Sequence, residues 1–453
     1  MLEDCWRDSP LTPTLTTTLE SVSVSTPSSP SYWRFWWPLA LVGLAMPLSK
    51  VFINGGLARL EDGVSELATV AYAEGLFHLA QATMAFLPQA ATVLVRSSAD
   101  HHRCRLLAMV LAVCVMIPIV AIGGPLRGLL TILYGIDGVI LDQAARYLLL
   151  LAPLLMLHAV VGYTTGLLVR HGRTGWVSIA TIAYLVSVAG VVTLADIWSW
   201  GPVTMVVGSQ AFALSVKACI VTLVWRAIPH DLGNEHDAPI SVAAIRAFFW
   251  PLAITSMMFA ASRPVIYAVV GLSENALFTV AVLRVAFDLG LLAQMPINQF
   301  RHVLVTFVAQ DHLGVARFMV ITTAIIALFS LIIIISPLSR IILDNTLGIA
   351  PEISEAVRST WLILVLVPIV VAWRNWHHGL AMVRQRTRSM ALAAILRVLG
   401  TGGLCLAALP LGLLNHHWGA LALVSGFLCE ALIVRFFGRR ASSPPALGKT
   451  QQH

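Results

Sequence analysis

Long apolar runs of about 20 residues, separated by short polar stretches, recur along the whole chain. An α-helix of that length crosses a hydrocarbon core about 30 Å thick, because each helical residue adds about 1.5 Å. The pattern therefore predicts an all-α polytopic membrane protein with about twelve transmembrane helices. The predicted spans are residues 35–53, 65–95, 106–125, 143–169, 175–195, 202–225, 246–271, 276–309, 316–337, 359–382, 389–412 and 417–437.

Composition supports the same class. Of the 453 residues, 58% are hydrophobic and 11% are charged, whereas a soluble domain has roughly 25% charged residues. The formal charge of +7 is spread over the ends of apolar runs, so we expect a lipid bilayer as the environment and no nucleic acid as a partner. The six cysteines show no CxxC spacing, and we expect free thiols.

Positive charge orients the predicted helices. Lys and Arg near span ends stay on the cytoplasmic side, and arginines gather in the connections after even-numbered spans, for example Arg96, Arg170, Arg226 and Arg384. We therefore expect both termini to be cytoplasmic, in a plasma or inner membrane. The Ser-, Thr- and Pro-rich residues 1–31 are predicted to be a disordered tail, and residues 439–453 form a second tail.

An internal echo divides the chain. Residues 35–40 (FWWPLA) recur as residues 248–253 (FFWPLA), and Gly166-Leu167 recurs as Gly379-Leu380, both at an offset of 213. That offset spans six helices, an even number, so the halves have the same orientation. We predict two parallel six-helix lobes, residues 32–226 and 244–438, joined by a loop at 227–243, with a substrate site between the lobes.

Ionisable residues inside the predicted spans are the candidate site. A Lys or Arg at the bilayer centre costs about 2.5–3.5 kcal/mol, so these groups must be paired or must face a water-filled cavity. The candidate substrate-binding residues are Lys50, Arg263, Arg284 and Arg374; the candidates for ion coupling or charge balance are Glu74, His78, Asp288, His378 and Glu430.

The repeat places several of these charges at matching positions. The same offset aligns Lys50 with Arg263, and one residue of slippage aligns Glu74 with Asp288. We therefore expect Lys50 and Arg263 to face each other across the central cavity. With Arg397 and Lys217, six cations stand against three carboxylates, which favours an anionic solute. An alternative is that Arg374, Arg397 and Lys217 extend to the membrane interface.

Three pairs lie four residues apart and share a helix face: Glu74 with His78, Arg284 with Asp288, and Arg374 with His378. Arg284 with Asp288 is either part of the site or a self-neutralising pair. Glu74 with His78 is either a proton relay, because histidine titrates near neutral pH, or a satisfied buried pair. The coupling ion would be H⁺ or Na⁺.

Motifs of catalysis do not appear in the sequence. There is no GxxxxGK[ST] phosphate loop, no HExxH and no Cys/His metal spacing. We expect neither an enzyme nor a bound cofactor or metal. Adjacent histidines such as His377 and His378 diverge by about 100° on a helix, which disfavours a shared metal.

The sequence resembles the progressive ankylosis protein family, within the superfamily of multidrug, oligosaccharidyl-lipid and polysaccharide exporters. The resemblance runs from about residue 32 to residue 438. It rests on Trp37-Pro38-Leu39, Asn54, Gly56, Glu61-Asp62, Phe249-Trp250-Pro251-Leu252-Ala253, Ser262-Arg263-Pro264, Met295-Pro296, Pro368, Arg374, Gly379, Gly419-Ala420 and Glu430.

The resemblance implies an exporter of small polyanions such as ATP, citrate or pyrophosphate. We expect alternating access between the lobes and a monomer. Two alternatives within the same fold are a flippase for lipid-linked phosphates or oligosaccharides and a cation-coupled multidrug exporter. A non-transporting receptor or scramblase-like component would gain nothing from charges on both lobes, and an enzyme acting on lipid phosphates lacks a nucleophile and base constellation.

Overall fold

The computed structural model describes residues 29–95, 97–228, 241–308, 310–383 and 387–440, which are helical with short connections and contain no strand. The first half contains α2 (Ser29–Ala58), α3 (Gly63–Ala82), α4 (Leu87–Leu94), α5 (Ser98–Gly123), α6 (Gly128–Tyr134), α7 (Gly138–Leu151), α8 (Leu154–Arg170), α9 (Thr174–Ile197) and α10 (Pro202–Ala227). The second half contains α11 (Val242–Val270), α12 (Ala276–Asn298), α13 (Phe300–Phe307), α14 (His312–Ile335), α15 (Leu338–Arg340), the π-helix η1 (Ile341–Thr346), α16 (Pro351–Leu364), α17 (Leu366–Val383), α18 (Thr387–Ala408), the 3₁₀ turn η2 (Leu409–Leu411) and α19 (His416–Arg440).

Eleven segments of the described chain are long and apolar enough to cross a membrane. The predicted second span, 65–95, is not among them; it consists of α3, which carries Glu66, Glu74 and His78 among its apolar residues, and the short α4. The other eleven predicted spans each correspond to one of these segments, so the all-α polytopic fold is confirmed. The predicted tails and the loop at 227–243 lie largely outside the described residues.

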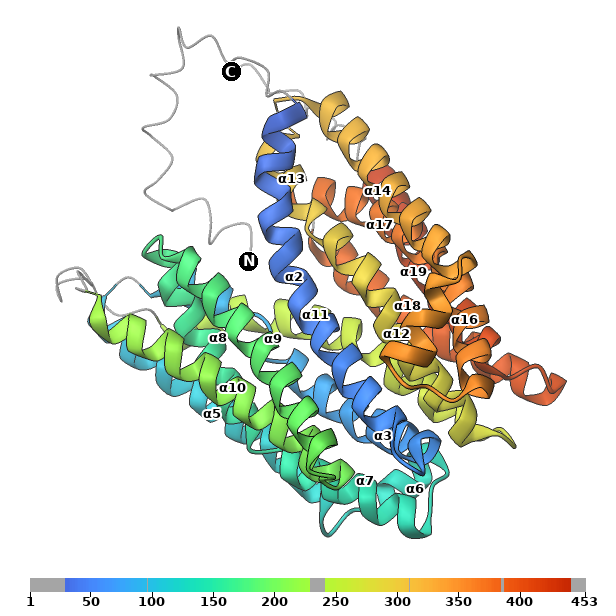
Figure 1. Cartoon of the computed structure of the whole chain (residues 1–453). Coiled ribbons are helices and arrows are strands. Elements are labelled where there is room, and N and C mark those ends of the chain that lie inside the picture. Colours follow the sequence, from blue (N-terminus) through green and yellow to red (C-terminus); the bar gives the residue numbers. More distant parts are fainter. Residues whose placement is uncertain (1–28, 96, 229–240, 309, 384–386, 441–453) are drawn as a thin grey trace, which may run out of the picture.

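The helices form two lobes with the same order of elements. The N-lobe comprises α2–α10 and the C-lobe comprises α11–α19, and Figure 1 shows them as a blue-to-green and a yellow-to-red half. The interruptions also repeat: α3 with α4 matches α12 with α13, and α7 with α8 matches α16 with α17. These breaks fall beside prolines such as Pro88, Pro153 and Pro296, because proline cannot donate the next helical hydrogen bond.

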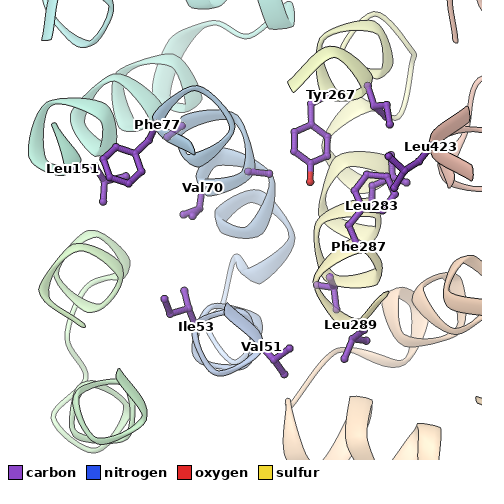
Figure 2. Packing of buried hydrophobic residues seen from close by; sticks show 14 of the residues in the cluster. Val51, Ile53, Val70, Phe77, Leu151, Tyr267, Leu283, Phe287, Leu289 and Leu423 are labelled. Atoms are coloured by element: carbon purple, nitrogen blue, oxygen red, sulfur yellow. The ribbon is translucent and has the colours of Figure 1, made fainter. Parts of the chain in front are cut away.

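The first helix of each lobe packs against the opposite lobe. Helix α2 runs between the lobes and contacts α9 on one side and α12 on the other, while α11 contacts α3 (Figure 1). The indole Nε1 of Trp36 donates to the carbonyl oxygen of Pro296 at 3.0 Å and holds α2 to the bend of α12. In Figure 2, Val51 of α2 points toward Leu289 of α12, whereas Ile53 points to the other side of α2.

Close packing of helices explains why Gly166 recurs as Gly379 in the sequence repeat. A Cβ on Gly166 would collide with the carbonyl of Pro88 in α4, and a Cβ on Gly379 would collide with Leu304 in α13. In lipid, such small residues let helix backbones approach and gain van der Waals contact. The two glycines therefore perform the same packing in each lobe.

Candidate functional site

A cavity of about 620 Å³ lies between the lobes and is lined by helices of both. Apart from histidines and a tyrosine, nine of its lining residues are ionisable. They are the cations Lys50, Arg263, Arg284, Arg301, Arg374 and Arg397, and the carboxylates Glu74, Asp288 and Glu430. With all of them charged, cations exceed carboxylates by three. The cavity is therefore suited to anions, because buried Arg and Lys seek negative partners.

The first group of charges, here called the interlobe network, comprises Lys50, Asn54, Glu74, Arg263, Arg284 and Asp288. Across the lobe boundary, Arg284 Nη2 lies 3.1 Å from Glu74 Oε2. The other Glu74 oxygen accepts a hydrogen bond of 2.6 Å from Gln210 Nε2. Both ends of this ion pair are buried. A buried ion pair therefore joins α3 to α12.

Asn54 of α2 extends the interlobe network. Its Oδ1 accepts from Arg284 Nε at 2.8 Å, and its Nδ2 donates to Asp288 Oδ2 at 2.9 Å. Arg263 Nη1 lies 2.6 Å from the second oxygen of Asp288 and its Nη2 donates to the Phe287 carbonyl at 2.8 Å. Both carboxylates of the network are thus fully engaged. Lys50 lines the cavity beside them and makes no hydrogen bond to a residue that the structure describes.

The second group of charges, here called the C-lobe cluster, comprises Arg301, Arg374, His378, Arg397 and Glu430. Glu430 Oε2 lies 3.0 Å from Arg397 Nη1 and 3.5 Å from Arg374 Nη1, and its Oε1 lies 3.3 Å from His378 Nε2. All of these residues lie on α13, α17, α18 and α19 of one lobe. A single carboxylate here faces three guanidinium groups.

Aromatic rings and backbone carbonyls position the two innermost guanidinium groups. Phe259 and Phe427 each lie over both Arg374 and Arg397, at 5.1–5.7 Å from guanidinium carbon to ring centroid. Arg397 Nη2 also donates to the Met258 carbonyl at 2.5 Å. Cation–π contact of this kind stabilises a desolvated guanidinium. Arg397 is 1% exposed, which makes it the largest fully buried side chain among the described residues.

The structure places the predicted site residues in one cavity but changes their pairing. Lys50 and Arg263 both line it, from α2 and α11. The pair of Arg284 with Asp288 is not formed: Arg284 pairs with Glu74, and Asp288 pairs with Arg263. Arg284 and Asp288 lie on the same helix, but each forms its ion pair with a residue of a neighbouring helix instead.

The histidines also differ from expectation. His78 Nδ1 lies 2.7 Å from the backbone carbonyl of Glu74 and not from its carboxylate; the proton relay stays a prediction. Arg374 and His378 do meet, through the shared carboxylate of Glu430.

The predicted count of six cavity cations holds with one exchange. Lys217 is not among the lining residues and stacks on Tyr184, 5.7 Å from its ring centroid. Arg301, which sequence reasoning missed, takes its place in the cavity wall. Arg374 and Arg397 are buried rather than extended to the interface. The available signal for Arg301 was Pro296, near the end of α12, because a proline interrupts a helix and Arg301 lies on the separate helix α13.

One end of the lobe boundary is closed. Arg59 at the end of α2 donates to the Thr346 carbonyl at 2.7 Å, and Gly271 packs so closely on Tyr134 that any Cβ would collide with its carbonyl. No residue of this closed end lines the cavity, whose lining extends the other way to Pro88, Gly162 and Arg301.

Several solved structures of membrane transporters and a flippase share this architecture. An inward-facing multidrug resistance MATE family transporter of the MOP superfamily matches with a TM-score of 0.71 and 15% identity over 89% of this chain and 100% of that one. The lipid II flippase MurJ, in an inward closed conformation, matches with a TM-score of 0.64 and 14% identity over 88% and 87%. A MOP superfamily transporter from Pyrococcus furiosus matches at 0.56 and 13% over 92% and 98%.

The fold thus defines a multi-pass membrane protein with the architecture of the MOP superfamily. Residues 23–308, well over half of the chain, match the family described as Progressive ankylosis protein (ANKH). The chain belongs to the progressive ankylosis protein family, and the resemblance found in its sequence is confirmed.

Proposed function

We propose that this protein transports small polyanions across the membrane by alternating access of the central cavity. The observation that carries the proposal is the charge of that cavity, in which six cations face three carboxylates. Burying so many cations is costly unless anions compensate them. A cargo with several negative charges supplies what the protein leaves out.

The closed end supports the alternating mechanism. The Arg59 contact and the packing of Gly271 on Tyr134 close one end, while the cavity lining continues toward the other. Arginines such as Arg170 and Arg226 lie at the ends of α8 and α10 on that second side, which makes it cytoplasmic by the positive-inside rule. The conformation would then be inward-facing, in a plasma or inner membrane.

Two other cargoes fit the fold. A lipid-linked phosphate would use the same cations, whereas an organic cation would be repelled by a cavity with excess positive charge. We therefore rank the polyanion first, the lipid-linked phosphate second and the organic cation last.

The test is uptake and efflux of labelled ATP, citrate and pyrophosphate in proteoliposomes that contain the purified protein, with ethidium as the cationic probe. We expect transport of at least one polyanion. The Arg263→Ala variant should lose at least about tenfold of it, because one charge-assisted contact contributes about 1.5–3 kcal/mol.

The matched control is Arg127→Ala, whose exposed ion pair with Asp142 lies outside the cavity. It should transport as the unaltered protein does. Transport of ethidium without any polyanion, or full polyanion transport by the Arg263 variant, would contradict the proposal.

A further inference from the structure

The 213-residue offset that relates the lobes exposes a difference between them at five cavity positions. Where the C-lobe has Arg301, Arg374, His378, Arg397 and Glu430, the N-lobe has Pro88, Val161, Thr165, Tyr184 and Lys217. In the interlobe network, in contrast, each lobe has one cation and one carboxylate at matching or nearly matching positions, Lys50 with Arg263 and Glu74 with Asp288. The C-lobe cluster is therefore not a part of the scaffold that both halves share.

Charge in the C-lobe cluster is incomplete. Three guanidinium groups face the single carboxylate of Glu430, so the cluster is two negative charges short of neutrality when His378 is neutral. The interlobe network has its two carboxylates bound to arginines and is short by one charge, on Lys50. A doubly charged group therefore finds its match in the C-lobe cluster.

Hydrogen-bond donors in the C-lobe cluster are also unused. The Nε atoms of Arg374 and Arg397 are buried and bond to nothing that the structure describes, although both side chains are at most 2% exposed. Arg301 makes one long bond of 3.4 Å, from Nε to the Asn298 carbonyl, and its two terminal nitrogens have no partner in the described chain. Buried donors of this kind normally have acceptors.

We propose that the C-lobe cluster is an oxyanion subsite, in which Arg301, Arg374 and Arg397 bind a doubly charged phosphate-type group. Planar guanidinium forks match the oxygen spacing of such a group. Glu430 occupies part of the subsite when it is empty and holds two of the arginines in place. Because every member belongs to one lobe, the group stays bound while the lobes move.

That the bound phosphate group is part of the transported cargo rests on the proposed function. Binding to the subsite can be measured separately from transport. The shared chemistry is a phosphate oxyanion, from a soluble diphosphate or from a lipid headgroup. Full-length protein in phosphatidylcholine nanodiscs would be titrated with pyrophosphate by calorimetry, and separate nanodiscs would contain a lipid-linked diphosphate as competitor.

The main variant is Arg301→Gln, which removes a partly exposed cation with a single weak bond and should leave the fold intact. We expect it to weaken pyrophosphate binding about ten- to hundredfold, as loss of a charge-assisted hydrogen bond does. Glu430→Gln removes the resident carboxylate and should strengthen binding about tenfold, a gain that damage to the fold cannot produce. Lys217→Gln, at the N-lobe position equivalent to Glu430, is the control and should bind as the unaltered protein does.

The outcomes separate the two proposals. Binding with this order of affinities supports the subsite even if proteoliposomes transport no polyanion, in which case the transport proposal fails alone. Competition by the lipid-linked diphosphate, with weak binding of free pyrophosphate, supports the subsite and identifies the headgroup as its source. Unchanged affinity of Arg301→Gln, or no binding of either phosphate compound, overturns the subsite even if transport is observed.

Discussion

The two lobes have the same helices in the same order, but they treat buried charge differently. In the N-lobe, Lys217 stacks on the ring of Tyr184, whereas the equivalent C-lobe positions form the ion pair of Glu430 with Arg397. The N-lobe position equivalent to Arg374 is Val161, a residue without charge. The two lobes therefore share a scaffold but carry different side chains at equivalent positions.

The largest expected effect tests this difference at one pair of equivalent positions. Arg374→Ala should lower the free energy of unfolding by about 3–5 kcal/mol, because it breaks a buried ion pair and strips Asn298 of a donor. Val161→Ala should cost only about 1–2 kcal/mol for two lost methyl groups. Denaturation in mixed micelles measures both. Equal losses of unfolding free energy would show that the charge of Arg374 does not stabilise the C-lobe more than the apolar side chain of Val161 stabilises the N-lobe.

A second prediction concerns the interlobe network. Arg284→Gln should cost about 3 kcal/mol, because Glu74 remains buried without its cation. Adding Glu74→Gln should recover about half of that loss, and a double-mutant cycle gives the coupling. The exposed pair of Arg127 with Asp142 serves as the reference, with coupling below about 1 kcal/mol. If the losses in unfolding free energy of the Arg284 and Glu74 changes were simply additive, the two side chains would not be coupled across the lobe boundary.

Closure of the lobe boundary gives a smaller effect. Arg59→Gln removes the hydrogen bond to the Thr346 carbonyl and the exposed ion pair with Asp196 at 3.2 Å, which together contribute about 1 kcal/mol at an exposed site. The closed end should then open about fivefold more often, seen as a longer distance between spin labels at the exposed positions Val139 and Leu272. Arg358→Gln, whose partner Glu355 lies on the same helix, should leave that distance distribution unchanged.

The smallest effect lies outside the membrane, where the third helix of each lobe is capped differently. Asp311 caps α14 in the C-lobe, and Ser97 caps α5 in the N-lobe. The Asp311 carboxylate accepts from the Gly314 amide at 2.8 Å and from the Tyr32 hydroxyl at 2.7 Å, and Arg317 lies nearby; these contacts, led by the amide, lower the pKa of that carboxyl.

A carboxyl whose pKa is lower in the folded state stabilises that state above its unfolded pKa of about 3.9. The stabilisation is lost as pH falls through the lowered value. Protection of the amides in the first turn of α14 against hydrogen exchange, relative to their intrinsic exchange rate, should therefore fall more at acid pH than it does in the Asp311→Ser variant, whose cap does not titrate. Identical pH dependence of the two proteins would exclude Asp311 as the cap that matters.

The fold could be predicted from the sequence because the length of an apolar run shows directly whether a helix can cross the membrane. Spacing of the repeat also pointed to four of the nine cavity charges: Lys50, Glu74, Arg263 and Asp288. The ion-pair partners of these charges could not be predicted from the sequence. Glu74 and Arg284 are 210 residues apart, and only the packing of α3 on α12 decides that they meet. Arg301 was missed because the predicted span 276–309 did not separate α13, the short helix that carries it, from α12.

The most direct test of the account is a cryo-electron microscopy structure of the protein in nanodiscs with saturating pyrophosphate. The account predicts density in the central cavity within hydrogen-bond reach of Arg301, Arg374 and Arg397, and no such density in a parallel sample without pyrophosphate. Density confined to the N-lobe wall beside Lys50, or an unchanged cavity with bound pyrophosphate elsewhere, would contradict it.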